Sequence, residues 1–191
     1  MSHLDPLRIE ELSPEMSDFL RRAEEGMGFQ PNDLFIMARL PNLVKAASEL
    51  VAAVFSNRGE VSLELKKLVA LVCSDSAGCM YCRAHNAHGA YRSGVSMEKI
   101  EAIWDYETSN LFSEAERAAL RLAQGGGQAP VKVSNSNFED LKKYYSSDQI
   151  AELVAVIALF GFLNRWNAIM ATDLEALPLK FAKEHLPVAT A

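Results

Sequence analysis

The sequence predicts an all-α protein, because helix-start signals recur along it and strand signals are almost absent. Ser13-Pro14-Glu15 places a capping serine before a proline at the first helical position. Ser113-Glu114-Ala115-Glu116 has the spacing of a capping box. Val131-Lys132-Val133 is the only stretch that alternates like a strand, and it is too short to form a sheet. We therefore expect a single-domain helical bundle.

The expected helices follow one another at short intervals, each bounded by a serine cap, a proline or a glycine. They span about residues 13–26, 41–55, 62–77, 79–93, 96–104, 113–124 and 146–175. Between the last two, Gly125-Gly126-Gly127 and the nearby Pro130 predict a loop. It is not a phosphate loop, because no Lys-Ser/Thr pair follows it and no strand precedes it.

Composition and charge limit the possible partners. The chain has 191 residues, of which 49% are hydrophobic and 23% charged, and its net charge of −6 argues against a nucleic-acid or anionic-membrane partner. The first residues lack the pattern of a secretory signal. The apolar run from Leu153 to Leu163 is shorter than the about twenty residues that span a bilayer, so it predicts a buried core helix. We expect a cytoplasmic protein, and the amount of apolar helical surface predicts a homo-oligomer.

The motif that carries chemistry is Cys79-Met80-Tyr81-Cys82, a C-x-x-C pair at a helix start. The partial positive charge and free N–H groups of a helix N-terminus stabilise a thiolate and lower a cysteine pKa below its usual value of about 8.5. One cysteine can then attack a peroxide or disulfide, and the other can resolve the product. Cys73 follows an apolar stripe, which predicts a buried thiol that stays reduced.

A zinc site is the alternative use of these residue types, since two histidines, His85 and His88, follow Cys79 and Cys82. On one helix each residue turns about 100°, so Cys79 and His88 would lie on roughly opposite faces. The sequence also offers no second C-x-x-C and no H-x-x-x-H motif. We expect no metal, and no other cofactor, because nucleotide, flavin and haem motifs are not visible.

His85 is the candidate base of this site. It follows Cys82 by three residues, and helical side chains lean towards the N-terminus, so the imidazole is expected to point at the turn that holds Cys82. There it can accept the thiol proton and stabilise the thiolate, whereas the alternative is a surface histidine. The helix dipole favours Cys79 as the attacking thiol, and the histidine favours Cys82. We expect Cys82 to attack and Cys79 to resolve.

The segment from Lys67 to His85, centred on Gly78-Cys79-Met80-Tyr81-Cys82, resembles the signature of the AhpD-like alkylhydroperoxidases of the carboxymuconolactone decarboxylase superfamily. Residues 160–167 resemble the final helix of a peroxidase-related subgroup. The resemblance covers residues 30–175 and implies thiol-dependent reduction of organic hydroperoxides by homo-oligomers such as trimers or hexamers. It divides the chain into a helical extension at 1–30, an AhpD-like domain at 31–175 and a C-terminal tail at 176–191.

Two positions depart from the family pattern. Family members often carry the histidine four residues after the second cysteine, where this chain has Asn86. The family also places a glutamate twelve residues before the first cysteine, as part of a proton relay, and here that residue is Lys67. Glu64, one turn earlier, is our candidate for the missing carboxylate. The alternatives are that Lys67 stabilises the thiolate as a cation, that Glu64 is a solvated helix-start residue, or that the relay is absent.

The expected function is that of an alkyl hydroperoxide reductase-like oxidoreductase in antioxidant defence. Its catalytic residues would be Cys79, Cys82, His85 and Glu64. Its partners would be a small hydroperoxide substrate and an external thiol or disulfide reductant. Two alternatives remain: a lactone decarboxylase of the wider superfamily, which would not depend on the dithiol, and a non-catalytic oligomeric redox sensor.

Overall fold

In the computed structural model, which describes residues 1–56 and 58–187, the chain is all-helical, as the sequence predicts, and this part of it contains no strand. Two short 3₁₀ helices are labelled η. In chain order the elements are η1 (Ile9–Glu11), α1 (Pro14–Met27), α2 (Asn32–Met37), α3 (Pro41–Val54), α4 (Leu63–Ser76), α5 (Met80–Arg92), α6 (Met97–Glu101), η2 (Ile103–Asp105), α7 (Glu114–Gly126), α8 (Asn135–Leu141), α9 (Ser147–Met170) and α10 (Ala176–His185).

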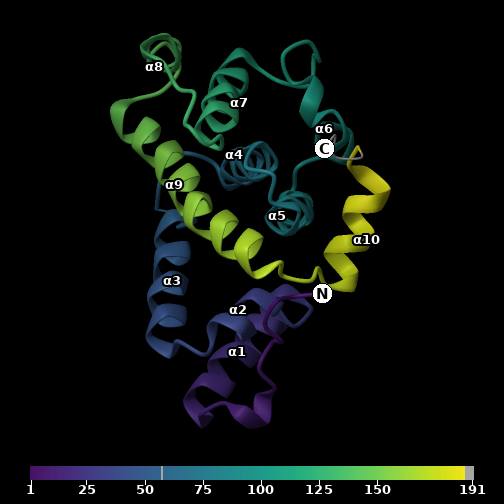
Figure 1. Cartoon of the computed structure of the whole chain (residues 1–191). Coiled ribbons are helices and arrows are strands. Elements are labelled where there is room, and N and C mark those ends of the chain that lie inside the picture. Colours follow the sequence, from purple (N-terminus) through teal and green to yellow (C-terminus); the bar gives the residue numbers. More distant parts are fainter. Residues whose placement is uncertain (57, 188–191) are drawn as a thin grey trace.

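Helix α4 forms the centre of the larger of two hydrophobic cores. It packs against α5, α7 and α9, and Figure 1 shows α4 and α5 in the middle of these helices. Leu68, Val69 and Leu71 are buried there, and burying such a side chain stabilises the fold by about 1.5–3 kcal/mol. Ser62 begins the helix as predicted, because its hydroxyl accepts a hydrogen bond from the Leu65 N–H (3.2 Å).

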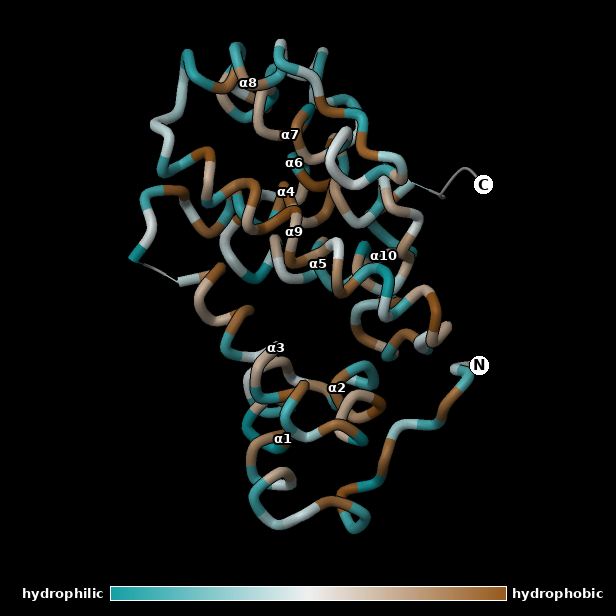
Figure 2. The backbone as a smooth tube through the Cα atoms, turned by 60° about the vertical axis from the view of Figure 1, so that its left-hand side comes forward, coloured by the Kyte–Doolittle hydropathy of each residue, from teal (hydrophilic) through white to brown (hydrophobic). Residues whose placement is uncertain are grey.

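A smaller core joins α1, α2 and α3. Met16 and Leu20 of α1 pack there with Phe35 and Met37 of α2 and Val44 of α3. Figure 2 shows these three helices as a body set off from the rest of the bundle. This core draws residues from both sides of position 30, where the sequence suggests a boundary between extension and domain. Its contacts with α9 run through α3 and Trp166.

Helix α9 holds the most apolar run of the chain. Leu153, Val156 and Phe160 are buried in the larger core, as expected of a core helix. The helix is 24 residues long, however, and by length and composition it could cross a membrane. Only 33% of its most apolar 18-residue window is buried within one chain, and Val154 and Phe162 lie exposed on its outer face. This face is consistent with the homo-oligomer expected from the sequence, which stays a prediction.

The C-terminal end of α9 differs from the sequence prediction. The helix ends at Met170 instead of continuing to Glu175, and Ala171 adopts a left-handed conformation with φ of 49°. The chain then turns back, and α10 occupies the segment that was expected to be a tail. Residues 188–191 of that tail lie outside the described residues. Because the helix ends here, the chain returns Glu175 to α5, where its carboxylate pairs with His85.

The segment from Gly125 to Pro130 was predicted to be a loop, and this is wrong for Gly125 and Gly126 but confirmed for residues 127–130, which lie outside any helix. Helix α7 continues through Gly126, and Gly127 remains in a right-handed helical conformation. The glycines are required by close packing instead of by a turn. A Cβ atom on Gly125 would lie 2.3 Å from the Lys132 carbonyl oxygen, and one on Gly127 would lie 2.3 Å from that of Cys73.

We therefore expect Gly127→Ala to lower the free energy of unfolding by about 3 kcal/mol, because the added methyl group must push α7 away from the α4 backbone. Gly26→Ala is the matched control. Nothing lies within 4 Å of a Cβ at Gly26 in α1, so this change should be neutral or stabilise by up to about 1 kcal/mol. Urea denaturation monitored by circular dichroism measures both. Equal stability of the two variants would contradict the packing argument.

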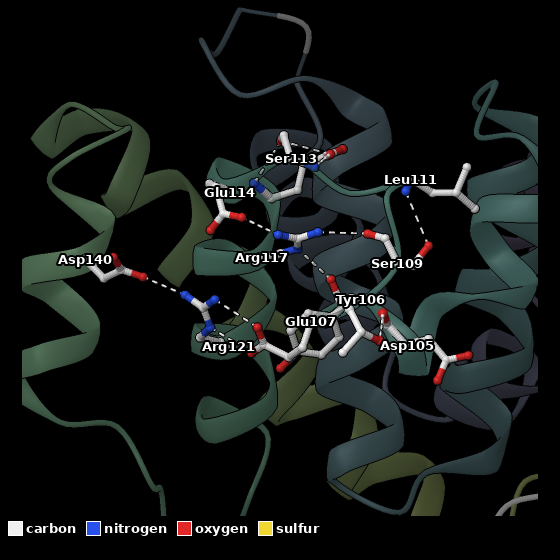
Figure 3. Close-up of polar contacts among 12 residues, drawn as sticks. Asp105, Tyr106, Glu107, Ser109, Leu111, Ser113, Glu114, Arg117, Arg121 and Asp140 are labelled. Atoms are coloured by element: carbon white, nitrogen blue, oxygen red, sulfur yellow. Dashed lines mark hydrogen bonds and ion pairs between the residues drawn. The ribbon is translucent and has the colours of Figure 1, made fainter.

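Arginines on α7 fix the loop that leads into this helix (Figure 3). Arg117 donates hydrogen bonds to the carbonyls of Tyr106 (2.9 Å) and Ser109 (2.8 Å). Arg121 pairs with Glu107 through both carboxylate oxygens (2.7 and 2.8 Å) and with Asp140 (2.6 Å). These contacts hold the η2–α7 connection and α8 against α7, and their role is structural.

Candidate active site

A cavity of about 490 Å³ lies between the smaller core and helices α4, α5 and α9. One wall is apolar and comes from α2, α3 and α9, with Leu34, Val51 and Phe160 among its residues. The other wall is one face of α5, and it carries most of the polar groups. That face presents Cys82, His85, Asn86, His88, Gly89, Arg92 and Ser93.

The dithiol stands at the start of α5, where the sequence places it. Cys79 is the N-cap residue, and its sulfur accepts a hydrogen bond from the Cys82 N–H (3.5 Å). A hydrogen bond from the Cys82 thiol and backbone N–H groups lower the pKa of Cys79, although burial opposes them. The same thiol hydrogen bond, together with burial, raises the pKa of Cys82. Of the two thiols, Cys79 is therefore the one that loses its proton more readily.

The two sulfurs differ in their access to the cavity. Both side chains are buried, with 3% of Cys79 and 4% of Cys82 exposed. Cys82 lines the cavity, and Cys79 is not among the described residues that do. Asn167 of α9 donates a hydrogen bond from Nδ2 to the Cys82 sulfur (3.5 Å), while its Oδ1 is buried without a partner in the described chain. Cys82 is thus the sulfur that a bound molecule meets, and Asn167 can stabilise charge on it.

His85 and Glu175 form a partly buried pair beside the dithiol. His85 Nε2 lies 2.6 Å from Glu175 Oε2, and the Tyr81 hydroxyl donates to Glu175 Oε1 (2.8 Å). The Tyr81 ring stacks on the imidazole with 4.2 Å between ring centroids. Burial raises the pKa of Glu175, but the His85 pairing and the Asn32 N–H outweigh it, so the pKa lies below its ordinary value. Glu175 is therefore a carboxylate that orients the imidazole.

The linker after α9 is held firmly enough to position Glu175. The Asn32 N–H donates to Glu175 Oε1 (2.7 Å), and the Asn32 side chain donates to the Asp173 carbonyl (2.9 Å). The Ser2 N–H donates to the Asp173 carboxylate (2.9 Å), and the His3 N–H donates to the Met170 carbonyl (2.8 Å). Backbone from the N-terminal segment and α2 thus fixes the carboxylate that faces His85.

Asp33 of α2 brings a second carboxyl group to this end of the cavity. Its backbone N–H donates to the Tyr81 hydroxyl (3.3 Å). Burial raises the pKa of Asp33, and the neighbouring Glu175 charge adds to that, although His85 opposes it. Burial also raises the pKa of Tyr81 well above its ordinary value, so the phenol keeps its proton. Asp33, Tyr81 and His85 thus line the same cavity as Cys82.

The structure brings Cys79, Cys82 and His85 together, as the sequence predicts, but it pairs them differently. The imidazole hydrogen-bonds to Glu175, and no hydrogen bond to either sulfur is found in the described part of the chain. Glu64, our candidate relay carboxylate, is exposed on α4 and does not line the cavity, so that assignment is wrong. Lys67, the alternative, does line it.

Asn86 takes a structural role at the position where family members often have histidine. Its amide donates to the Ala70 carbonyl (3.4 Å) and the Ser74 hydroxyl (3.2 Å), so it ties α5 to α4 beside the dithiol. His88 lies on the cavity wall against Phe29 and Phe181. No group of three or more histidine, cysteine or acidic side chains that could hold a metal ion is found in residues 1–56 and 58–187.

Cys73 is separate from this site. It lies in the larger core, with its sulfur 3.9 Å from the Ile157 carbonyl, and burial raises its pKa to about 12. We expect mild peroxide to produce a disulfide between Cys79 and Cys82 while Cys73 stays reduced. Peptide mass spectrometry should show the loss of two hydrogens on the peptide that holds both cysteines. A disulfide that contains Cys73 would show that the predicted pairing of Cys79 with Cys82 is wrong.

Comparison with known proteins places this site in a family. The sequence pattern of the carboxymuconolactone decarboxylase family matches residues 41–125. The debrominase Bmp8 shares 35% sequence identity and a TM-score of 0.87, over 96% of this chain and 98% of the debrominase. This chain belongs to the carboxymuconolactone decarboxylase family. The structure of a cysteine-to-alanine variant of the debrominase in complex with 2,3,4-tribromopyrrole is similar to the same degree.

Two further proteins resemble the chain less closely. A peroxidase-related protein with an alkylhydroperoxidase AhpD core from Ralstonia eutropha JMP134 has 17% identity and a TM-score of 0.82, over 95% of both chains. The protein YnjA of Escherichia coli is 26% identical over 139 residues, which are 73% of this chain and 76% of YnjA. The family match ends at residue 125. Asn167 and Glu175 follow it and Asp33 precedes it, so these three site residues lie outside the matched range.

Proposed function

We propose that this protein is a dithiol reductase that binds a small apolar molecule in the cavity and reduces it by two electrons. The observation that carries the proposal is that Cys82 opens onto the cavity while Cys79, the more acidic thiol, stands one helical turn away. The pair can transfer its proton internally, since Cys79 accepts the Cys82 proton as the Cys82 sulfur attacks. A reducing compartment such as the cytoplasm would regenerate the dithiol through an external thiol.

With an organic hydroperoxide the steps balance as follows. The Cys82 sulfur attacks the outer peroxide oxygen and becomes a sulfenic acid, the O–O bond breaks, and the alkoxide takes a proton from the His85–Glu175–Tyr81 group or from Asp33. Glu175 occupies Nε2 of His85, which leaves Nδ1 for the substrate. Cys79 then displaces water from the sulfenic acid and forms the disulfide. The net reaction converts the hydroperoxide and two thiols into an alcohol, water and a disulfide.

Reductive dehalogenation is the second candidate, and the 35% identity with a debrominase over nearly the whole chain favours it. Here the Cys82 sulfur would take bromine from carbon, and the electron pair of the C–Br bond would stay on the ring and accept a proton from the same donors. Cys79 would then displace bromide from the sulfenyl bromide. The products are the debrominated ring, bromide and the same disulfide, so one dithiol arrangement serves both reactions.

The experiment is turnover with dithiothreitol as reductant and either cumene hydroperoxide or a series of brominated pyrroles as substrate. Alcohol formation is followed by chromatography and bromide release by ion chromatography. Consumption of either substrate that requires Cys82 supports the dithiol reductase, and the product identifies the reaction. Absence of thiol-dependent turnover with both classes would overturn the proposal and favour a redox sensor.

A further inference from the structure

The far end of the cavity is cationic. Lys67 of α4 and Arg92 of α5 both line it, at the opposite end of the α5 face from Cys82. The Lys67 ammonium lies 3.7 Å from the position of a Cβ on Gly89, two helical turns after Cys82. At 1.5 Å per residue, seven residues of α5 separate the thiol from this end by about 10 Å.

No carboxylate forms an ion pair with Lys67 or Arg92 in the described part of the chain, although Glu64 Oε1 lies 4.0 Å from the position of a Cβ on Gly94, two residues after Arg92. Lys67 makes no ion pair or hydrogen bond in that part of the chain, and its ammonium instead lies 4.0 Å from the centre of the Phe55 ring. Arg92 donates to the carbonyls of Gly26 (2.9 Å) and Met27 (3.1 Å), which leaves its charge without a carboxylate. Burial, together with the Arg92 charge, lowers the pKa of Lys67 to about 8. A partly buried ammonium without a carboxylate partner is costly, and a bound anion would offset that cost.

Neither the carboxylate nearest to Lys67 in sequence nor the Asp33 carboxylate in the cavity forms an ion pair with Lys67 in the described part of the chain. Glu64 lies one turn before Lys67 on α4, but its side chain is exposed. Asp33 lines the cavity at the other end, where its neighbours are Tyr81, His85 and Glu175. The cavity is therefore polarised, with acid–base side chains at the Cys82 end, the Lys67 charge about 10 Å away and Arg92 about 15 Å away along α5, and apolar walls between them.

We propose that Lys67, supported by Arg92, binds the anionic group of the substrate, so that the protein acts on apolar organic acids such as carboxylates or acidic phenols. The reactive atom meets Cys82 while the acid group pairs with Lys67. The statement that the reactive atom meets Cys82 rests on the proposed function. The anion site does not, because it is defined by Lys67 and Arg92 alone. Lys67 is thus a specificity-determining residue. Its ammonium lies beside Gly89, two turns of α5 beyond Cys82, and is too far from the Cys82 sulfur to contact it.

The test compares octanoate with 1-octanol, which share a chain length that spans the cavity and differ in charge. Isothermal titration calorimetry with the full chain should show octanoate binding at least about tenfold more tightly, a difference of about 1.4 kcal/mol. Lys67→Met should remove that preference and leave 1-octanol affinity within about twofold. Lys67→Arg should retain it, because a guanidinium also pairs with carboxylate.

Two controls separate this inference from the proposed function. Lys142→Met removes an exposed charge on the far side of the molecule, after α8, and should leave the preference unchanged. Cys82→Ser should abolish turnover and leave octanoate binding intact, so failure of the redox reaction does not remove the anion site. Equal affinity for octanoate and 1-octanol, no binding of either, or an unchanged preference in a folded Lys67→Met variant would overturn the inference.

Discussion

Cys82→Ser should lower thiol-dependent turnover at least about 1,000-fold with either substrate class, because the serine hydroxyl cannot supply the electron pair that a thiolate does. In the absence of dithiothreitol, which would itself reduce a sulfenic acid, Cys79→Ser should instead permit one reduction per chain and then stop. This variant lacks the Cys79 thiol and cannot form the disulfide, so the sulfenic acid on Cys82 should persist and react with dimedone. The serine at position 79 can still cap α5, so this variant is expected to fold.

Mass spectrometry of the dimedone adduct locates the attacking sulfur, and Cys73→Ala serves as the control that leaves the cavity unchanged. The result also decides between two physical effects. Cys79 has the lowered pKa, but Cys82 has the access to substrate. A dimedone adduct on Cys79 in Cys82→Ser, formed as fast as the adduct on Cys82 in Cys79→Ser, would show that acidity outweighs access and that the roles are exchanged.

Glu175→Gln should lower turnover about 100-fold and also destabilise the fold, since one carboxylate orients His85 and accepts hydrogen bonds from Tyr81 and Asn32. The amide keeps the size of the side chain but removes the charge that faces the imidazole. Loss of a hydrogen bond to a charged buried group costs about 1.5–3 kcal/mol. We expect a loss of this size in urea denaturation at pH 7.

The pH dependence of this variant follows from the lowered pKa of Glu175. A carboxyl group whose pKa is lower in the folded state stabilises that state above its unfolded pKa of about 4.5, and the contribution is lost as pH falls through the folded value. The stability difference between wild type and Glu175→Gln should therefore be constant near neutral pH and shrink below about pH 4.5. Glu184→Gln changes an exposed glutamate of α10 as a control. A difference independent of pH would mean that charge is not what Glu175 contributes.

Most helix starts could be predicted from local sequence because a serine cap acts within one turn. Ser13, Ser62, Ser96, Ser113 and Ser146 each accept a backbone hydrogen bond as predicted. The glycine run of α7 could not be interpreted in this way, since a glycine that permits a turn and one that permits close packing look the same in one sequence. Only the positions of α4 and residue 132 show which applies.

The site could be predicted in part for a similar reason. Cys79, Cys82 and His85 share one helix, so their spacing fixes their proximity. Glu175 is 90 positions from His85, and nothing in its local sequence indicates that α9 ends at Met170 and returns it to α5. The choice between Glu64 and Lys67 depends on the rotation of α4 about its axis, which tertiary packing determines and which places Lys67 on the cavity side.

The division of the hydrophobic interior into two cores separates the evolution of selectivity from that of reactivity. The thiols and His85 belong to α5, which is anchored in the larger core, while much of the apolar wall that a substrate would touch belongs to α2 and α3. Substitutions at wall positions of the smaller core, such as Leu34 or Ala47, can reshape the cavity without disturbing the packing that supports the dithiol. The lining that selects a bound molecule can thus change while the packing around the two thiols stays the same.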